Sequence, residues 1–280
     1  MHPFWRFLIS AMYVVAAQWA AAIFGTVVFP SHPLLADLLY RLAGCGLLIG
    51  GFTFMLYVFD ETDRPPIAAM GLPHRLGWVC EILRGLAIGA GLVSLAVLSI
   101  AIFGHITLEA HLNGTALLNG IVVFFLLLVG AMFEELIFRG YPFQRLLDAV
   151  GPISAILAMS AVFAAMHLEN PHAGGFWSWG FLNTILVGVL FSVAYIRSRT
   201  LWLPFGIHFG WNFALGMVYG LPVSGLHRFS VLVRGSAKGP ALLTGGSYGV
   251  EASLTGAVVV VLGVLIVFAA TRNRQADWPE

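Results

Sequence analysis

Long apolar runs recur along the chain, and they restrict its possible folds more than any other feature. An α-helix needs roughly 20 apolar residues to cross the hydrocarbon core of a bilayer. Eight such runs can be drawn, at residues 7–29, 35–58, 80–103, 117–138, 151–168, 178–196, 202–220 and 254–271. Only 10% of the 280 residues are charged, against about 25% in soluble domains. The sequence therefore predicts an all-α, polytopic membrane protein with about eight transmembrane helices, forming a single transmembrane domain over residues 1–280.

Lysine and arginine residues between the apolar runs predict how the chain is oriented. Cytoplasmic loops carry an excess of these residues. With eight spans and the N-terminus inside, four of the 14 Lys and Arg residues fall outside, and the other ten fall inside. The four outside residues are Arg41, Arg228, Arg234 and Lys238. We therefore expect both termini in the cytoplasm. The Gly- and Arg-rich, lysine-poor composition favours a bacterial protein, and hence the bacterial cytoplasmic (inner) membrane.

Two adjacent carboxylates, Glu134 and Glu135, close the fourth apolar run. A charge at membrane depth costs at least a few kcal/mol, so this pair needs an explanation. In a helix, Glu135 and Arg139 are i,i+4 neighbours with the acid on the N-terminal side, which is the favourable orientation. Glu134 points about 100° away and lacks that partner. We expect Glu135 to be paired and Glu134 to be free for chemistry.

Three more polar side chains interrupt later apolar runs: His167, His208 and Asn212. Such groups inside membrane helices are expected to face the bundle interior, and the last two share a helix face at i,i+4. If residues 117–138 and 151–168 form a hairpin that turns near 148–150, Glu134 and His167 lie at similar depths, about 20–25 Å from the turn. His208 follows Pro204 closely, so its depth is harder to match. If all the faces converge, they form one polar cavity.

Such a cavity can perform acid–base chemistry. A glutamate partly buried in an apolar site is a better general base near neutral pH. Glu134 could deprotonate a water that attacks a peptide carbonyl, with assistance from His167. His208 and Asn212 could donate hydrogen bonds to the developing oxyanion. The sequence shows no serine or cysteine beside a histidine in the pattern of an activated nucleophile, so water is the expected nucleophile.

Three motifs in this order resemble one family. Glu134-Glu135-x-x-x-Arg139-Gly140, Phe163-x-x-x-His167 and His208-x-x-x-Asn212 are similar to the motifs of the CPBP family. That family comprises type II CAAX prenyl proteases and the bacteriocin-processing and self-immunity (ABI) proteins. The resemblance covers residues 117–220, and a Gly-rich stretch at 242–251 also looks like one found before the last span of bacterial members.

The resemblance implies a glutamate-dependent intramembrane endopeptidase that acts without a cofactor. It implies Glu134 as the activator of water and His167 as its assistant. His208 and Asn212 would form the oxyanion site, with Glu135 and Arg139 as supporting residues. The expected partners are the lipid bilayer and a peptide or membrane-anchored protein substrate. Because bacteria generally lack prenylated CAAX proteins, we expect a different substrate here.

Three alternatives remain open from the sequence. Two histidines and one or two glutamates could bind zinc as a His₂Glu metalloprotease site, although the H-E-x-x-H motif is absent. The same cavity could instead bind a bacteriocin or another peptide without cleaving it, as a self-immunity protein does. Carboxylate and histidine chains also relay protons in transporters, but the chain shows no inverted repeat. The net charge of +1 gives no indication of a nucleic-acid partner.

Overall fold

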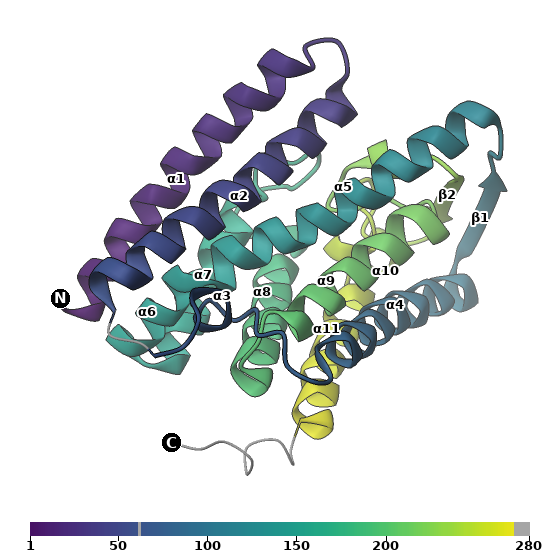
Figure 1. The fold of residues 1–280 in the computed structure, drawn as a ribbon. Helices are drawn as coiled ribbons and strands as arrows, with labels where there is room; N and C mark the ends of the chain where they lie inside the picture. Colours follow the sequence, from purple (N-terminus) through teal and green to yellow (C-terminus); the bar gives the residue numbers. More distant parts are fainter. Residues whose placement is uncertain (61–62, 272–280) are drawn as a thin grey trace.

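All eight predicted apolar runs form helices in the computed structural model, which describes residues 1–60 and 63–271 (Figure 1). The four from the first half of the chain are α1 (Pro3–Val28), α2 (Pro33–Phe59), α4 (Trp78–Phe103) and α5 (Gly114–Arg139). The four from the second half are α7 (Pro152–Met166), α8 (Trp179–Ser198), α9 (Trp202–Phe213, continued by a π-helical turn, Ala214–Val218) and α11 (Leu254–Ala270). The all-α architecture is confirmed.

Five helical stretches within the described residues are long and apolar enough to cross a membrane. They are Pro3–Val28, Pro33–Phe59, Trp78–Phe103, Gly114–Val150 and Trp179–Ser198. The other three predicted runs form shorter helices: α7 with 15 residues, α9 with 12 and α11 with 17. The chain is therefore a multi-pass membrane protein in which some of the apolar helices are shorter than a full span.

Several short elements were not predicted. The helices α3 (Pro66–Ala69), α6 (Tyr141–Val150) and α10 (Ala241–Thr244) lie between the longer helices, as do two 3₁₀ turns, η2 (His227–Phe229) and η3 (Val250–Ala252). The strands β1 (His105–Ala110) and β2 (Val233–Lys238) form an antiparallel pair, with Thr107 opposite Ser236. This pair attaches the long loop 221–253 to the end of α4. The intervening α6 also means that α5 and α7 are not the simple hairpin that we expected.

Helix α9 occupies the centre of the bundle, and every residue from Trp202 to Trp211 is buried. Figure 1 shows it lying between α4, α5 and α8. Glycines let α4 and α9 approach closely: a Cβ at Gly89 would lie 2.1 Å from the Ile207 carbonyl oxygen, and one at Gly206 would lie 2.4 Å from the Ile82 carbonyl oxygen. Close approach through small residues is a common way for membrane helices to pack.

A polar cluster joins several helix ends at one end of the bundle. Arg6 Nη1 of α1 lies 2.8 Å from Asp60 Oδ1, and Arg145 Nη1 of α6 contacts the same oxygen. The Tyr141 hydroxyl donates a hydrogen bond to Asp60 Oδ2 at 2.6 Å. The start of α1 and the end of α2 therefore lie at the same end, as antiparallel neighbours do.

Candidate active site

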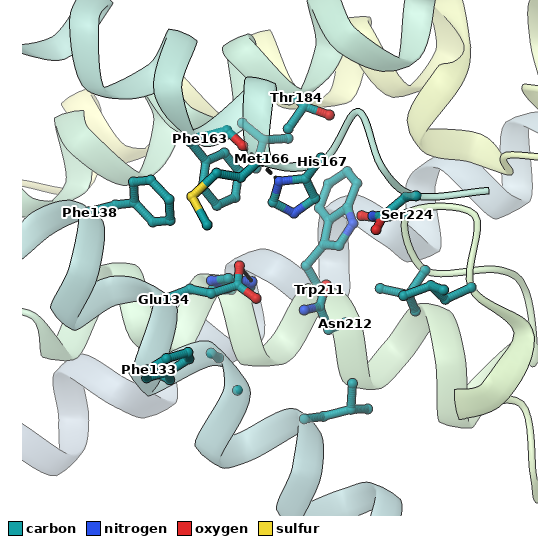
Figure 2. A pocket seen from close by; sticks show the side chains of 18 of the residues that line it. Phe133, Glu134, Phe138, Phe163, Met166, His167, Thr184, Trp211, Asn212 and Ser224 are labelled. Atoms are coloured by element: carbon teal, nitrogen blue, oxygen red, sulfur yellow. Dashed lines mark hydrogen bonds and ion pairs between the residues drawn. The ribbon is translucent and has the colours of Figure 1, made fainter. Parts of the chain in front are cut away.

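A cavity of about 250 Å³ opens between the central helices and the loop 221–253. Its wall includes Glu134 of α5, His167 at the end of α7, and His208 and Asn212 of α9. Figure 2 shows the labelled Glu134, His167 and Asn212 side chains around the same hollow. The structure therefore brings together all four residues that the sequence predicted as catalytic. Glu135 and Arg139 lie behind the wall, and both of their side chains are fully buried.

Glu134 faces the cavity with two different neighbours at its two carboxylate oxygens. Oε2 lies 3.7 Å from His208 Nε2. Oε1 lies 3.3 Å from Nη1 of Arg41 on α2. Glu134 therefore has a cationic partner, Arg41, that the sequence analysis did not predict. Arg41 was counted among the outside charges although it falls in the predicted run 35–58; it lies within α2 and lines the cavity.

The predicted ion pair between Glu135 and Arg139 is present, with 3.6 Å between Glu135 Oε1 and Arg139 Nη1. Arg139 Nη2 donates a hydrogen bond to the Gly188 carbonyl oxygen of α8 at 2.9 Å. The guanidinium carbon lies 5.0 Å from the Phe163 ring centre and 5.2 Å from that of Phe191. Cation–π contacts of this length favour a buried charge. The pair thus fastens α5 to α7 and α8 directly behind the cavity.

His208 lies between the two glutamates. Its Nδ1 is 2.8 Å from Glu135 Oε1, and because a carboxylate only accepts, Nδ1 carries the proton. The ring stacks on Phe191, with centroids 4.7 Å apart. Glu135 and Phe191 together fix the ring so that Nε2 is directed toward Glu134 and the cavity.

His167 follows the last residue of α7, and its ring lines the cavity (Figure 2). Its Nδ1 lies 2.7 Å from the Phe163 carbonyl oxygen. A carbonyl oxygen is only an acceptor, so Nδ1 is the donor. In the neutral ring, Nε2 is then left as a proton acceptor.

The sequence analysis did not predict Glu251 as a residue of the site. It only noted the Gly-rich stretch 242–251, which Glu251 ends. It lines the cavity, and its carboxylate accepts hydrogen bonds from Trp211 Nε1 at 2.9 Å and from the Ser224 backbone N–H. Burial raises the pKa of Glu251. Glu251 lies just before the last helix, so no i,i+4 spacing connects it to any of the three motifs. The Gly-rich stretch was its only signal in the sequence. Glu251 clamps the loop 221–253 to α9 at the cavity.

A metal site was the alternative use of these residues. Among residues 1–60 and 63–271, no group of three or more His, Cys, Asp or Glu side chains is placed to hold a metal ion. Adding a chelator to the peptidase assay tests the zinc alternative directly.

One protein-family model matches part of the chain. Residues 115–214 match a protein-family model described as type II CAAX prenyl endopeptidase Rce1-like. This segment nearly coincides with the predicted core at 117–220 and contains all four cavity residues that were predicted as catalytic. The match confirms the family resemblance drawn from the motifs. No curated protein and no solved structure matches the chain.

Proposed function

We propose that this chain, whose residues 115–214 match the Rce1-like endopeptidase family, is an intramembrane endopeptidase of the glutamic type. The observation that carries the proposal is the convergence of Glu134, His167, His208 and Asn212 on one cavity from three separate helices. A carboxylate, two imidazoles and an amide are sufficient for water activation and oxyanion binding.

The proposed reaction begins with a water between Glu134 and the scissile carbonyl. Glu134 accepts a proton as the water oxygen attacks the carbonyl carbon, and the carbonyl oxygen becomes an oxyanion. When the C–N bond breaks, Glu134 returns the proton to the departing amine nitrogen. His167 Nε2 faces the cavity as an acceptor and assists by holding the water.

The oxyanion would be stabilised by Asn212 Nδ2 and His208 Nε2. Since His208 Nδ1 already donates to Glu135, Nε2 can donate only when the ring carries both protons. The carboxylates of Glu134 and Glu135 flank the ring, with Glu134 Oε2 3.7 Å from Nε2 and Glu135 Oε1 2.8 Å from Nδ1. Glu135 and Arg139 would therefore act through His208 rather than on the substrate.

The proposed substrate is a peptide bond of a membrane-associated protein or peptide, reached from the bilayer. We place the protein in the bacterial inner membrane with both termini in the cytoplasm. The clustering of Arg6 and Arg145 at the end of the bundle that holds the start of α1 supports this orientation, because cytoplasmic ends carry such residues.

The test uses the purified protein in detergent micelles with a library of fluorogenic peptides. Glu134→Gln and His208→Ala are expected to abolish cleavage, because each removes a group that acts on the reacting atoms. Glu109→Gln is the matched control, since Glu109 is an exposed carboxylate on β1. Each protein is assayed with and without a strong chelator, and we expect the chelator to have no effect.

The other results point to different functions. Loss of cleavage with the chelator and recovery with zinc would assign the same residues to a metalloprotease. Binding of a peptide or bacteriocin that survives Glu134→Gln, without cleavage by the wild type, would favour a self-immunity protein.

A further inference from the structure

Arg41 reaches the cavity from α2, outside the segment that matches the family. Its Nη1 contacts Glu134 Oε1 at 3.3 Å, and its Nε donates to Asp37 Oδ1 at 3.1 Å. Asp37 Oδ2 in turn lies 2.8 Å from Nη2 of Arg228 on the 3₁₀ turn η2. A chain of alternating charges therefore runs from Arg228 in the loop 221–253 through Asp37 and Arg41 to Glu134 in the cavity.

The facing surface of α5 is shaped around this guanidinium. Gly130 lies one helical turn before Glu134, and a Cβ there would be 2.7 Å from Arg41 Nη1. One residue before Glu134, Phe133 packs edge-on against Tyr40, with ring centroids 5.2 Å apart. Gly44 leaves room for the same Phe133 ring, 2.4 Å from a Cβ placed on that glycine. The glycine at 130 and the aromatic pair fix α2 and α5 in the register that brings Arg41 to Glu134.

We propose that Arg41 is a positioning residue for Glu134, with Asp37 holding its guanidinium. The inference rests on the proposed peptidase function and adds to it a residue from the N-terminal helices. Arg41 acts through Glu134 rather than on the substrate.

The two oxygens of Glu134 then have separate tasks. Arg41 holds Oε1, while Oε2 faces His208 Nε2 at 3.7 Å, and is left to take the proton of the water. Arginine is always charged and has no acceptor atom, so it cannot compete for that proton and remains an anchor throughout the cycle. The ion pair fixes the rotation of the carboxylate, which a solvated glutamate would leave free.

The experiment compares wild type, Arg41→Gln and Arg41→Lys in steady-state cleavage of the best peptide from the library. Misplacing a reacting group by about 1 Å costs on the order of 100-fold in rate. We expect Arg41→Gln to lower kcat by about that factor with little change in KM, and Arg41→Lys to recover part of the loss. The control is Arg6→Gln, which breaks an ion pair of comparable burial, with 19% of the Arg6 side chain exposed against 17% for Arg41. It should leave kcat unchanged.

A second variant leaves the arginine at position 41 unchanged and displaces its guanidinium instead. It shows whether a loss of activity in Arg41→Gln comes from misplacement of Glu134 or from a folding defect. Gly130→Ala pushes on Nη1 and should lower kcat, whereas Gly46→Ala on α2, where a Cβ meets nothing within 4 Å, should not. If wild type cleaves and both Arg41→Gln and Gly130→Ala retain the kcat of their controls, the inference is wrong and the proposed function stands. A wild type without peptidase activity would overturn both.

Discussion

The buried pair of Glu135 and Arg139 provides the sharpest test of how the site is supported. Arg139→Met replaces the arginine by an uncharged side chain of similar length, which removes the cation beside Glu135. Neither side chain of the pair is exposed. Removing one partner of a buried ion pair costs about 3–5 kcal/mol, because the other charge stays buried. The hydrogen bond to the Gly188 carbonyl oxygen is lost in the same step. We therefore expect the free energy of unfolding to fall by about 3–5 kcal/mol in total.

The double variant Glu135→Gln/Arg139→Met separates charge from packing. It removes both charges, and replacing a whole buried pair by neutral groups is often close to neutral. The Gln carbonyl still accepts from His208 Nδ1, so the double variant should be more stable than Arg139→Met alone. Its peptidase activity should stay low, since the charged acceptor at His208 Nδ1 becomes a neutral one, and hydrogen bonds to neutral groups hold their partners less strongly.

The assay is unfolding by SDS titration in mixed micelles, followed by circular dichroism. Asp148→Asn is the control, because it breaks an ion pair with Arg145 in which 50% of the Asp148 side chain is exposed. Such surface pairs contribute about 0–1 kcal/mol. The reasoning fails if Arg139→Met costs no more than this control, or if the double variant is as unstable as the sum of its single changes.

Two further changes test the packing of α4 against α9 and the protonation of Glu251 in the loop 221–253. Gly89→Ala places a Cβ 2.1 Å from the Ile207 carbonyl oxygen and should destabilise the fold by about 1–3 kcal/mol. Gly91→Ala on the same helix meets nothing within 4 Å; equal losses for the two in the SDS titration would contradict the packing argument. Burial raises the pKa of Glu251 above the usual 4.5, so the folded state binds this proton more tightly than the unfolded state. Stability should therefore fall as the pH rises from about 4.5 through the folded-state pKa, and a Glu251→Gln variant with the same pH dependence of Tm as wild type would refute this.

Much of the helical framework could be predicted because apolar run length is a local property. The run at 254–271, for example, became α11 (Leu254–Ala270), with ends within a residue of those drawn from the sequence. The pair of Glu135 and Arg139 was equally accessible, since i,i+4 spacing places two side chains together within one helix. The pairing of β1 with β2 was missed. The two six-residue strands lie far apart in the sequence, with His105 opposite Lys238, and they carry no common local signal.

The contacts between elements could not be predicted in this way. Arg41 and Glu134 are 93 residues apart, and no spacing rule connects α2 with α5. Arg41 falls inside the predicted run 35–58, and the positive-inside rule counted it only as an outside charge near the end of that run. The structure shows instead that an arginine inside a helix can be held by Asp37 and Glu134 at the cavity. The depth of His208 was uncertain for a related reason, because α9 is positioned by its neighbours rather than by the bilayer.

The shortness of the central helix has a consequence for how the protein is made. Its 12 residues and the five of the π-helical turn that continues it rise at most about 25 Å, short of the roughly 30 Å of a bilayer core. Because such a segment is shorter than a full span and is enclosed by its neighbours, we expect α9 to take its place only after α4 and α8 are present. Since α9 carries His208 and Asn212, the newly synthesised chain lacks its proposed oxyanion site until assembly is complete. Under the proposed function, this order of assembly would keep an incompletely folded chain inactive in the membrane where it is built.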